Sequence, residues 1–277
     1  MNIATGPDGN LWFTESNGPK VGRMTPSGSV IEYPVPVGSA PAGITAGADG
    51  KLWFAETNAN KIVRMTTSGV MNEFSLGSGV YPAWVTAGPD GNVWYTAQAG
   101  DEVGRITPAG TITRFQMTPG DNPSGITAGP DGNIWFTQRF GNHIVKMTPG
   151  GSITGYAIGN TPFNITKGPD GNVWYADAGA NVIGRITPSG TKSEFSIPTV
   201  DSRPAGIVLG PDGNLWFTEH GGNKIGRITP TGTITEYRVP TSASGPAGIT
   251  LGPDGYIWFT ETYGDKIGRI GPCTPPS

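Results

Sequence analysis

Cysteine, histidine and charged residues are all scarce in this chain of 277 residues. There is one cysteine, there are two histidines, and Asp, Glu, Lys and Arg together make up 14% of the sequence. A single cysteine, Cys273, excludes an intrachain disulfide. A Ser–His–Asp order, a zinc-type pair of histidines and a phosphate-cradling glycine loop are all missing, so the sequence carries no signature of these three chemistries.

A basic surplus and long apolar runs are missing as well. Eighteen basic residues stand against 21 acidic ones, which gives a formal net charge of −3. Nucleic-acid-binding proteins and polybasic membrane-surface proteins need a cationic face, so we expect neither kind of partner. No apolar run approaches the roughly 18–20 residues of a membrane span, and residues 1–5 do not read as a signal peptide. The cellular compartment stays open.

Glycine and proline are abundant, with 45 and 26 residues. Without a sequence period, such a content is typical of disordered chains. Here a period exists, because a Trp recurs every 39–42 residues, each time after an Asp-Gly turn and eleven positions before a basic residue. The seven tryptophans are Trp12, Trp53, Trp94, Trp135, Trp174, Trp216 and Trp258. Seven copies of a unit of about 41 residues indicate a repeat fold.

Each unit reads as four short strands. In residues 204–240, segments rich in β-branched and aromatic residues are separated by the turns Pro-Asp-Gly-Asn and Thr-Pro-Thr-Gly. Four strands repeated seven times predict an all-β fold, a seven-bladed β-propeller that forms one domain over residues 1–277, with 271–277 as a tail. The Trp and basic rows are expected to pair across two strands, with the cation over the indole face.

The seventh unit lacks a fourth strand after residues 266–270. We therefore predict a seventh blade without its outer strand, or one that the tail or another molecule completes. An unpaired edge strand is a template for pairing, so self-association through this edge is one expected consequence.

The loops between second and third strands and the connections between units vary, whereas the first and third turns of the units are nearly identical. Variable loops on a rigid scaffold commonly carry function, so we expect a small molecule or a protein to bind on this face. Trp84, Phe163 and Asn164 replace small residues at first strands and should narrow one side of the central opening. They would stack on a ligand or plug the channel. Arg203 and Tyr263 lie in the variable segments and complete the candidate ligand-binding set.

Carboxylates dominate one position at the end of the second strands. They are Glu15, Glu56, Asp177, Glu219 and Glu261, with Ala97 and Gln138 in the other two units. Such a ring could hold a divalent cation, for which Glu219 and Glu261 are the candidate ligands. The alternative is that each acid caps its own loop by accepting backbone N–H groups. His220 follows Glu219, and His220 and Glu261 are the only candidates for catalysis.

The repeated motifs resemble one known family. Gly-Pro-Asp-Gly-Asn-Leu-Trp-Phe-Thr-Glu at 210–219 and Asn-Lys-Ile-Gly-Arg-Ile-Thr-Pro at 223–230 are similar to those of the virginiamycin B lyase (streptogramin B lyase) family, over essentially the whole chain. The resemblance implies a seven-bladed propeller. It also implies a Mg²⁺-dependent elimination that opens a cyclic depsipeptide at its ester, with histidine as acid or base.

The sequence departs from that family at the catalytic positions. The resemblance places two histidines after the prolines that open units six and seven, where this chain has Ala205 and Ala247. A metal-binding Glu of the family corresponds to Gly245, and a second corresponds to Glu261. We therefore expect a lyase-like propeller without lyase activity, which serves as a binding scaffold. The alternative is a Mg²⁺-dependent carbon–oxygen lyase with a rearranged site built from Glu219, His220 and Glu261.

Overall fold

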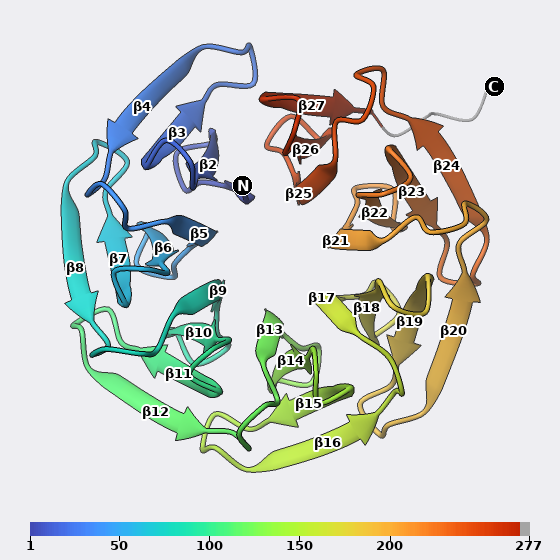
Figure 1. Ribbon diagram of the computed structural model, residues 1–277, viewed down its shortest axis with the longest axis horizontal. Coiled ribbons are helices and arrows are strands. Elements are labelled where there is room, and N and C mark those ends of the chain that lie inside the picture. Colours follow the sequence, from blue (N-terminus) through green and yellow to red (C-terminus); the bar gives the residue numbers. More distant parts are fainter. Residues whose placement is uncertain (272–277) are drawn as a thin grey trace.

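The computed structural model describes residues 1–271, which form a closed ring of small β-sheets around a central axis (Figure 1). Six sheets have four strands and one has three, and every sheet follows the order of the sequence. The predicted seven-bladed propeller is therefore confirmed, including its three-stranded seventh blade. No helix is found in the described part of the chain, and hence none that could cross a membrane. The prediction that residues 272–277 help to complete blade 7 falls outside the described residues.

Each blade consists of consecutive strands. The strands are β1 (Ile3–Thr5), β2 (Leu11–Glu15), β3 (Lys20–Met24), β4 (Val30–Pro34), β5 (Pro41–Ala46), β6 (Leu52–Glu56), β7 (Lys61–Met65), β8 (Met71–Ser75), β9 (Pro82–Ala87), β10 (Val93–Ala97), β11 (Glu102–Ile106), β12 (Ile112–Gln116), β13 (Pro123–Ala128), β14 (Ile134–Gln138), β15 (His143–Met147), β16 (Ile153–Ala157), β17 (Pro162–Lys167), β18 (Val173–Asp177), β19 (Val182–Ile186), β20 (Lys192–Ser196), β21 (Pro204–Leu209), β22 (Leu215–Glu219), β23 (Lys224–Ile228), β24 (Ile234–Arg238), β25 (Pro246–Leu251), β26 (Ile257–Glu261) and β27 (Lys266–Ile270). Blade 1 is β1–β4, each later blade takes the next four strands, and blade 7 is β25–β27.

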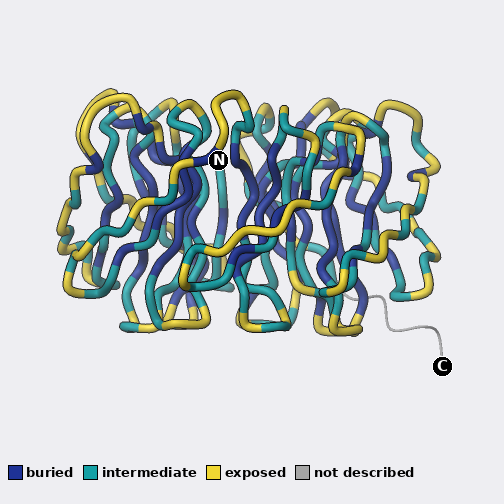
Figure 2. The backbone as a smooth tube through the Cα atoms, turned by 90° about the horizontal axis from the view of Figure 1, so that it is seen from below, coloured by how far each residue is buried: buried dark blue, intermediate teal, exposed yellow. Residues whose placement is uncertain are grey.

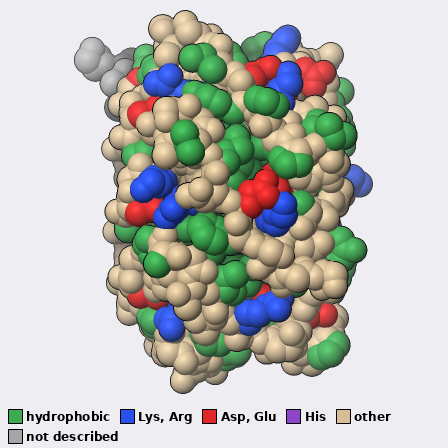
Figure 3. Space-filling model, turned by 90° about the vertical axis from the view of Figure 1, so that its left-hand side faces the viewer, with side chains coloured by type: hydrophobic (Ala, Val, Ile, Leu, Met, Phe, Trp, Pro, Cys, Tyr) green, Lys and Arg blue, Asp and Glu red, His purple; other side chains and the backbone are tan. Residues whose placement is uncertain are grey.

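The first strand of each blade lies at the axis, and in blades 1–6 the fourth strand lies at the rim (Figure 1). Seen edge-on, buried strands run through the middle of the disc, and exposed turns form both faces (Figure 2). On the side of the disc drawn in Figure 3, basic and acidic side chains are interspersed rather than gathered by sign. The second turns and the connections between blades share one face, which we call the variable-loop face.

One polar unit explains the Trp and basic rows, and its ion pair between the basic residue and the turn Asp is formed in blades 1, 3, 5, 6 and 7. In blade 6, Trp216 pairs with Arg227 across β22 and β23. The Arg227 guanidinium carbon lies 5.9 Å from the centre of the indole ring. Trp216 Nε1 donates to Asp212 Oδ1 at 3.1 Å, and Arg227 Nε donates to Asp212 Oδ2 at 2.7 Å. The basic row is therefore structural, and the Asp-Gly turn anchors the Trp that follows it.

The same bond from Trp Nε1 to the turn Asp is present in all seven blades, at 2.9–3.1 Å. Burial alone would raise the pKa of the Asp212 carboxyl, but the hydrogen bonds from Asn214, Arg227 and Trp216 together hold its pKa below the ordinary value. The pKa values of four equivalent carboxyls are lowered in the same way, those of Asp8, Asp90, Asp131 and Asp170.

These lowered pKa values predict acid sensitivity. A carboxyl whose pKa is lower in the folded than in the unfolded state contributes stability that is present above the unfolded pKa of about 3.9, and that stability is lost as the pH falls through the folded pKa. Urea unfolding at pH 7, 4 and 3 should show this loss. Asp212→Asn should reduce the free energy of unfolding by about 1 kcal/mol at pH 7 and by less at pH 3. An equal loss at both pH values would contradict the assignment.

Candidate functional site

A cavity of about 360 Å³ lies at the axis and opens on the variable-loop face. It is lined by Met1, Asn2, Ser16, Ala42, Gly43, Ala83, Trp84, Gln98, Arg139, Phe163, Ala205, Ala247 and Gly248. Most wall residues belong to first strands, and Ser16, Gln98 and Arg139 directly follow β2, β10 and β14. Small side chains form much of the wall, so the large side chains stand out from it.

Two of the predicted ligand-binding residues meet in this cavity. The rings of Trp84 in β9 and Phe163 in β17 contact edge to face, with centroids 5.8 Å apart and an interplanar angle of 87°. Gly125 of the blade between them lets β13 approach the backbone of β17, because a Cβ there would lie 2.7 Å from the Phe163 carbonyl oxygen. Asn164 does not line the cavity, and its Oδ1 accepts the backbone N–H of Ile165 at 2.6 Å.

The cavity also holds a cation that sequence reasoning missed. The Arg139 guanidinium carbon lies 5.5 Å from the ring centre of Phe140 and 5.3 Å from that of Phe163. Its Nε is buried without a hydrogen-bond partner, and the described residues offer Arg139 no salt bridge. A half-buried guanidinium that lacks an anionic partner can bind one from solution.

A sequence signal for Arg139 was present in the repeats. The residue that follows the second strand is Ser16 in blade 1 and Thr57 in blade 2, and each hydroxyl donates to the proline carbonyl oxygen that opens the next blade, at 2.9 and 2.8 Å. Gln98, Arg139, Ala178 and His220 have no such hydroxyl at this position. Comparing the units there would have marked Arg139 as the one with a full positive charge.

The row of carboxylates does not form one site. Glu219 and Glu261 are buried, and each lies beneath its own loop, with Oε2 2.8 Å from the place of a Cβ on Gly222 and 2.7 Å from that on Gly264. Over residues 1–271, no group of three or more His, Cys, Asp or Glu side chains is arranged to hold a metal ion. Metal binding by Glu219 and Glu261 stays a prediction.

The other interpretation of these carboxylates is that each caps its own loop, and the structure shows such capping for Asp177. Asp177 Oδ1 accepts the backbone N–H groups of Gly179 at 3.0 Å and Ala180 at 2.9 Å. Glu219 has no such donor, since both of its oxygens are buried without a hydrogen-bond partner in the described structure. Burial first, and then the neighbouring Glu236 carboxylate, raise the pKa of Glu219 to about 8.

The raised pKa of Glu219 predicts that stability falls as the pH rises. Between the unfolded pKa of about 4.3 and the folded value of about 8, the folded state binds more protons than the unfolded one, so unfolding becomes easier with each pH unit. Glu219→Gln removes the titrating carboxyl and with it this pH-dependent loss of stability. The substitution should raise the melting temperature by about 3–6 °C at pH 8 and by less at pH 5.

Glu32→Gln is the matched control for this measurement, because Glu32 forms an exposed ion pair with Lys20. It should change the melting temperature little at any pH. If the difference in melting temperature between wild type and Glu219→Gln were the same at every pH from 5 to 9, the raised pKa of Glu219 would be refuted.

His220 and Tyr263 form a second cluster on the same face. Their rings are tilted by 57° with centroids 5.4 Å apart. Arg203 is exposed nearby, and its carbonyl oxygen accepts the N–H of His220 at 3.2 Å. None of the three lines the central cavity, so the structure separates them from Trp84 and Phe163.

Gly245 lies against this cluster and has a φ of +60°. A Cβ there would lie 2.6 Å from Tyr263 Cδ2 and 2.9 Å from His220 Cε1. The two rings therefore occupy the space that a larger side chain would need, and the backbone conformation also favours glycine.

Comparisons with known proteins agree with the motif resemblance. The model of the virginiamycin B lyase family matches residues 1–161 and 157–274. A solved structure of streptogramin B lyase is 37% identical, with a TM-score of 0.92 over 97% of this chain and 91% of that one. Virginiamycin B lyase from Staphylococcus aureus is 38% identical, with a TM-score of 0.92 over 97% and 93% of the two chains. Among curated proteins, no relative matches at a significant level.

A further solved structure is a catalytically inactive virginiamycin B lyase from Staphylococcus aureus with quinupristin, in which alanine replaces a histidine. It is 38% identical to this chain, with a TM-score of 0.92 over 97% and 93% of the two chains. Ala205 and Ala247, which stand where the resemblance places histidines, both line the central cavity of this chain.

Proposed function

Because this chain belongs to the virginiamycin B lyase family, we propose that it keeps the family's scaffold as a binding module and lacks the lyase activity. The observation that carries this proposal is the wall of the central cavity. Ala205 and Ala247 stand there at the positions where the resemblance places histidines, and no carboxylate or histidine side chain of residues 1–271 lines the cavity.

Elimination needs a group that removes a proton next to the ester. Such a general base must reach the substrate within hydrogen-bond distance and have a pKa near the working pH. The side chains of Ser16, Gln98 and Arg139 are the polar groups that follow second strands in the cavity wall, and none of them is such a base. A histidine-to-alanine change accompanies inactivity in the Staphylococcus aureus relative, which supports the same conclusion for a chain with two alanines.

The other side chains of the cavity wall indicate which kind of ligand would fit. Trp84 and Phe163 offer aromatic surface, and Arg139 offers one guanidinium without an acidic partner. Small, mostly apolar cavities with a few polar groups are typical of small-molecule sites. We infer a ligand with a planar apolar portion and one negative charge, such as a carboxylate that accepts two N–H bonds from Arg139.

Calorimetric titration with a panel of aromatic carboxylates, and with the matching amides, tests this proposal. Carboxylates should bind and their neutral amides should bind about ten- to thirtyfold more weakly, the effect of losing a charge-assisted hydrogen bond. Arg139→Gln should cause a similar loss and remove the difference between acid and amide.

Arg203→Gln is the control, because Arg203 is exposed on the same face outside the cavity. It should leave the affinity unchanged. Equal binding of acids and amides, or an equal loss in both variants, would contradict the role of Arg139.

Two measurements separate binding from the lyase alternative. Purified protein should not open a streptogramin B ring with Mg²⁺ present, because no histidine or carboxylate side chain of residues 1–271 lines the cavity. Mg²⁺ or Mn²⁺ should not raise the melting temperature. Ring opening, or a metal-dependent rise that Glu261→Ala abolishes, would favour the rearranged lyase site instead.

A further inference from the structure

The wall of the central cavity contains a second polar group besides Arg139, the amide of Gln98. Gln98 is half-buried, and it holds in blade 3 the position that Arg139 holds in blade 4, directly after the second strand. The two side chains therefore come from the same turn of two neighbouring blades. Because both line one cavity of about 360 Å³, a small molecule bound by Arg139 can also reach Gln98.

One hydrogen bond orients the amide of Gln98. Its Nε2 donates to Ser124 Oγ at 3.1 Å. Ser124 belongs to β13 and is fully buried, so its hydroxyl holds the amide nitrogen in one direction. A carboxamide is planar, with its nitrogen and its oxygen on opposite edges. The amide oxygen of Gln98 is thus turned away from Ser124, and no hydrogen bond from residues 1–271 occupies it.

Both partners of this bond depart from the repeat. Ser124 follows the proline that opens blade 4, and four other blades have alanine at that position, namely Ala42, Ala83, Ala205 and Ala247. Gln98 stands where the turns of blades 1 and 2 have a hydroxyl that bonds to the next blade. Blades fold with alanine in the one place and a hydroxyl in the other, so the fold does not require the contact between Gln98 and Ser124.

The charge of Arg139 favours the same orientation of the amide. A guanidinium has only hydrogen-bond donors, and so has the amide nitrogen. An amide that turned its nitrogen to the cavity would add donors beside a cation, whereas the amide oxygen is the negative end of its dipole. The wall of the cavity therefore offers donors at Arg139 and an acceptor at Gln98.

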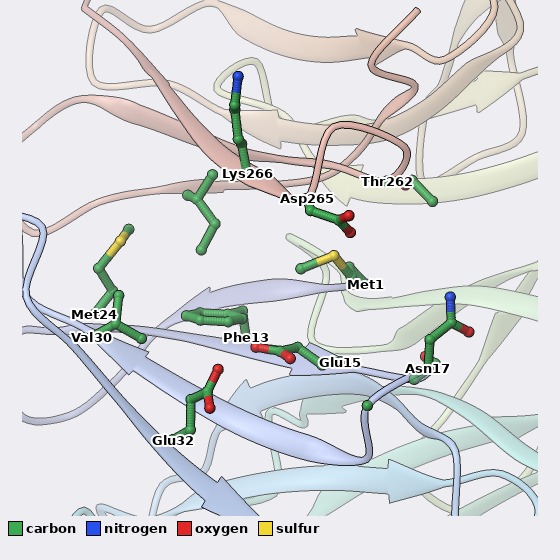
Figure 4. A pocket seen from close by; sticks show the side chains of 13 residues that line it. Met1, Phe13, Glu15, Asn17, Met24, Val30, Glu32, Thr262, Asp265 and Lys266 are labelled. Atoms are coloured by element: carbon green, nitrogen blue, oxygen red, sulfur yellow. The ribbon is translucent and has the colours of Figure 1, made fainter. Parts of the chain in front are cut away.

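A larger groove of about 600 Å³, between blades 7 and 1, has the opposite charge. Figure 4 shows Glu15 and Glu32 of blade 1 on one side and Asp265 of blade 7 on the other, with Lys266 as the one cation among the lining residues. Burial first, and then the Glu32 and Asp265 carboxylates, raise the pKa of Glu15. Acids that already disfavour one another's charge also disfavour an anionic ligand, so such a ligand selects the central cavity.

We propose that the ligand of the central cavity carries, besides its ring and its carboxylate, a hydroxyl or N–H group that donates a hydrogen bond to Gln98 Oε1. Gln98 determines specificity for this donor, and Ser124 is a positioning residue that holds the amide. The chemical class is an aromatic acid with a separate donor, such as a hydroxylated aryl carboxylate or an indole carboxylate. This inference rests on the proposed function, because it takes place in the same cavity beside Arg139.

Calorimetric titration of the whole protein with naphthoate, its hydroxy derivatives and their methyl ethers tests the donor. The hydroxy derivatives cover each free position of the ring, because the direction from the carboxylate to Gln98 selects one of them. For at least one position, the hydroxy acid should bind about five- to tenfold more tightly than naphthoate, the effect of one added hydrogen bond. Its methyl ether, which accepts but cannot donate, should show no such gain.

Two variants assign the gain to the amide. Gln98→Met keeps the length of the side chain and removes its oxygen, so the hydroxy acid should lose its advantage over naphthoate. Ser124→Ala introduces the residue of four other blades and frees the amide to rotate. The advantage of the hydroxy acid should then fall to about twofold, and the methyl ether should bind more tightly than it does to wild type. A merely structural role of Ser124 would not change the order of these ligands.

Gln116→Met is the matched control. Gln116 lies outside the cavity, and its Nε2 donates to the carbonyl oxygens of Gly100 and Asp101, at 2.9 Å each. It therefore holds the turn that carries Gln98 without contributing to the cavity wall. Gln116→Met should keep the preference for the hydroxy acid. An equal loss of preference in Gln116→Met and Gln98→Met would mean that the shape of the turn matters rather than the oxygen of Gln98, and would overturn the proposal.

The outcomes separate this inference from the proposed function. If acids bind better than their amides but no hydroxyl position improves binding, or a methyl ether gains as much, the donor to Gln98 is overturned and the role of Arg139 stands. If a hydroxyl improves binding while acids and amides bind equally, the role of Arg139 fails and the inference about Gln98 stands. No binding of any of these acids at millimolar concentration would overturn both.

Discussion

The fold depends on one buried indole ring per blade. Trp216 is fully buried and joins four parts of its blade. Its Nε1 donates to Asp212 in the first turn, Arg227 of the third strand covers one face, and Tyr237 of the fourth strand stacks on it at 5.7 Å. A rigid aromatic ring with a single donor suits this role, because it combines a large apolar surface with one directional bond. The spacing of the tryptophans follows from this geometry.

This shared unit restricts where the blades can differ. The packed side chains of each blade leave little room for substitution. The ring of Phe217, for example, occupies the place of a Cβ on the facing Gly226. Diversity is tolerated in the second turns, where Ser16, Arg139 and His220 occupy the same position in three blades. A charged side chain in such a turn reaches the axis without disturbing the packing between strands. Binding properties can therefore change while the stability of the ring is preserved.

Other side chains stand in this chain where the resemblance places the family's catalytic residues. Ala205 and Ala247 leave an open wall, and the rings of His220 and Tyr263 fill the space beside Gly245. A larger side chain at Gly245 would require both rings to move. In a propeller the scaffold and the variable-loop face use different positions of the repeat, so the fold by itself does not determine the activity.

The sequence by itself determined the architecture. Seven tryptophans at regular spacing, with Asp-Gly turns before them and cations after them, specify the blades because each contact lies within one repeat or between neighbouring strands. The three-stranded seventh blade could be predicted for the same reason. The pairing of Trp84 with Phe163 could be anticipated only as a narrowing of the channel, since ring orientation depends on packing across blades.

Tertiary structure alone decided which side chains act together. Glu219 and Glu261 look alike in the sequence, yet each is buried beneath a separate loop, and burial gives Glu219 a pKa of about 8. Arg139 lies over the rings of Phe140 and Phe163, and the contact with Phe163 of the next blade is one that a single repeat does not encode. The groove beside β27 arises where blade 7 meets blade 1, residues far apart in the chain. The repeats determine the contacts within each blade. The burial of a side chain and its contacts with other blades depend on segments that are far apart in the sequence.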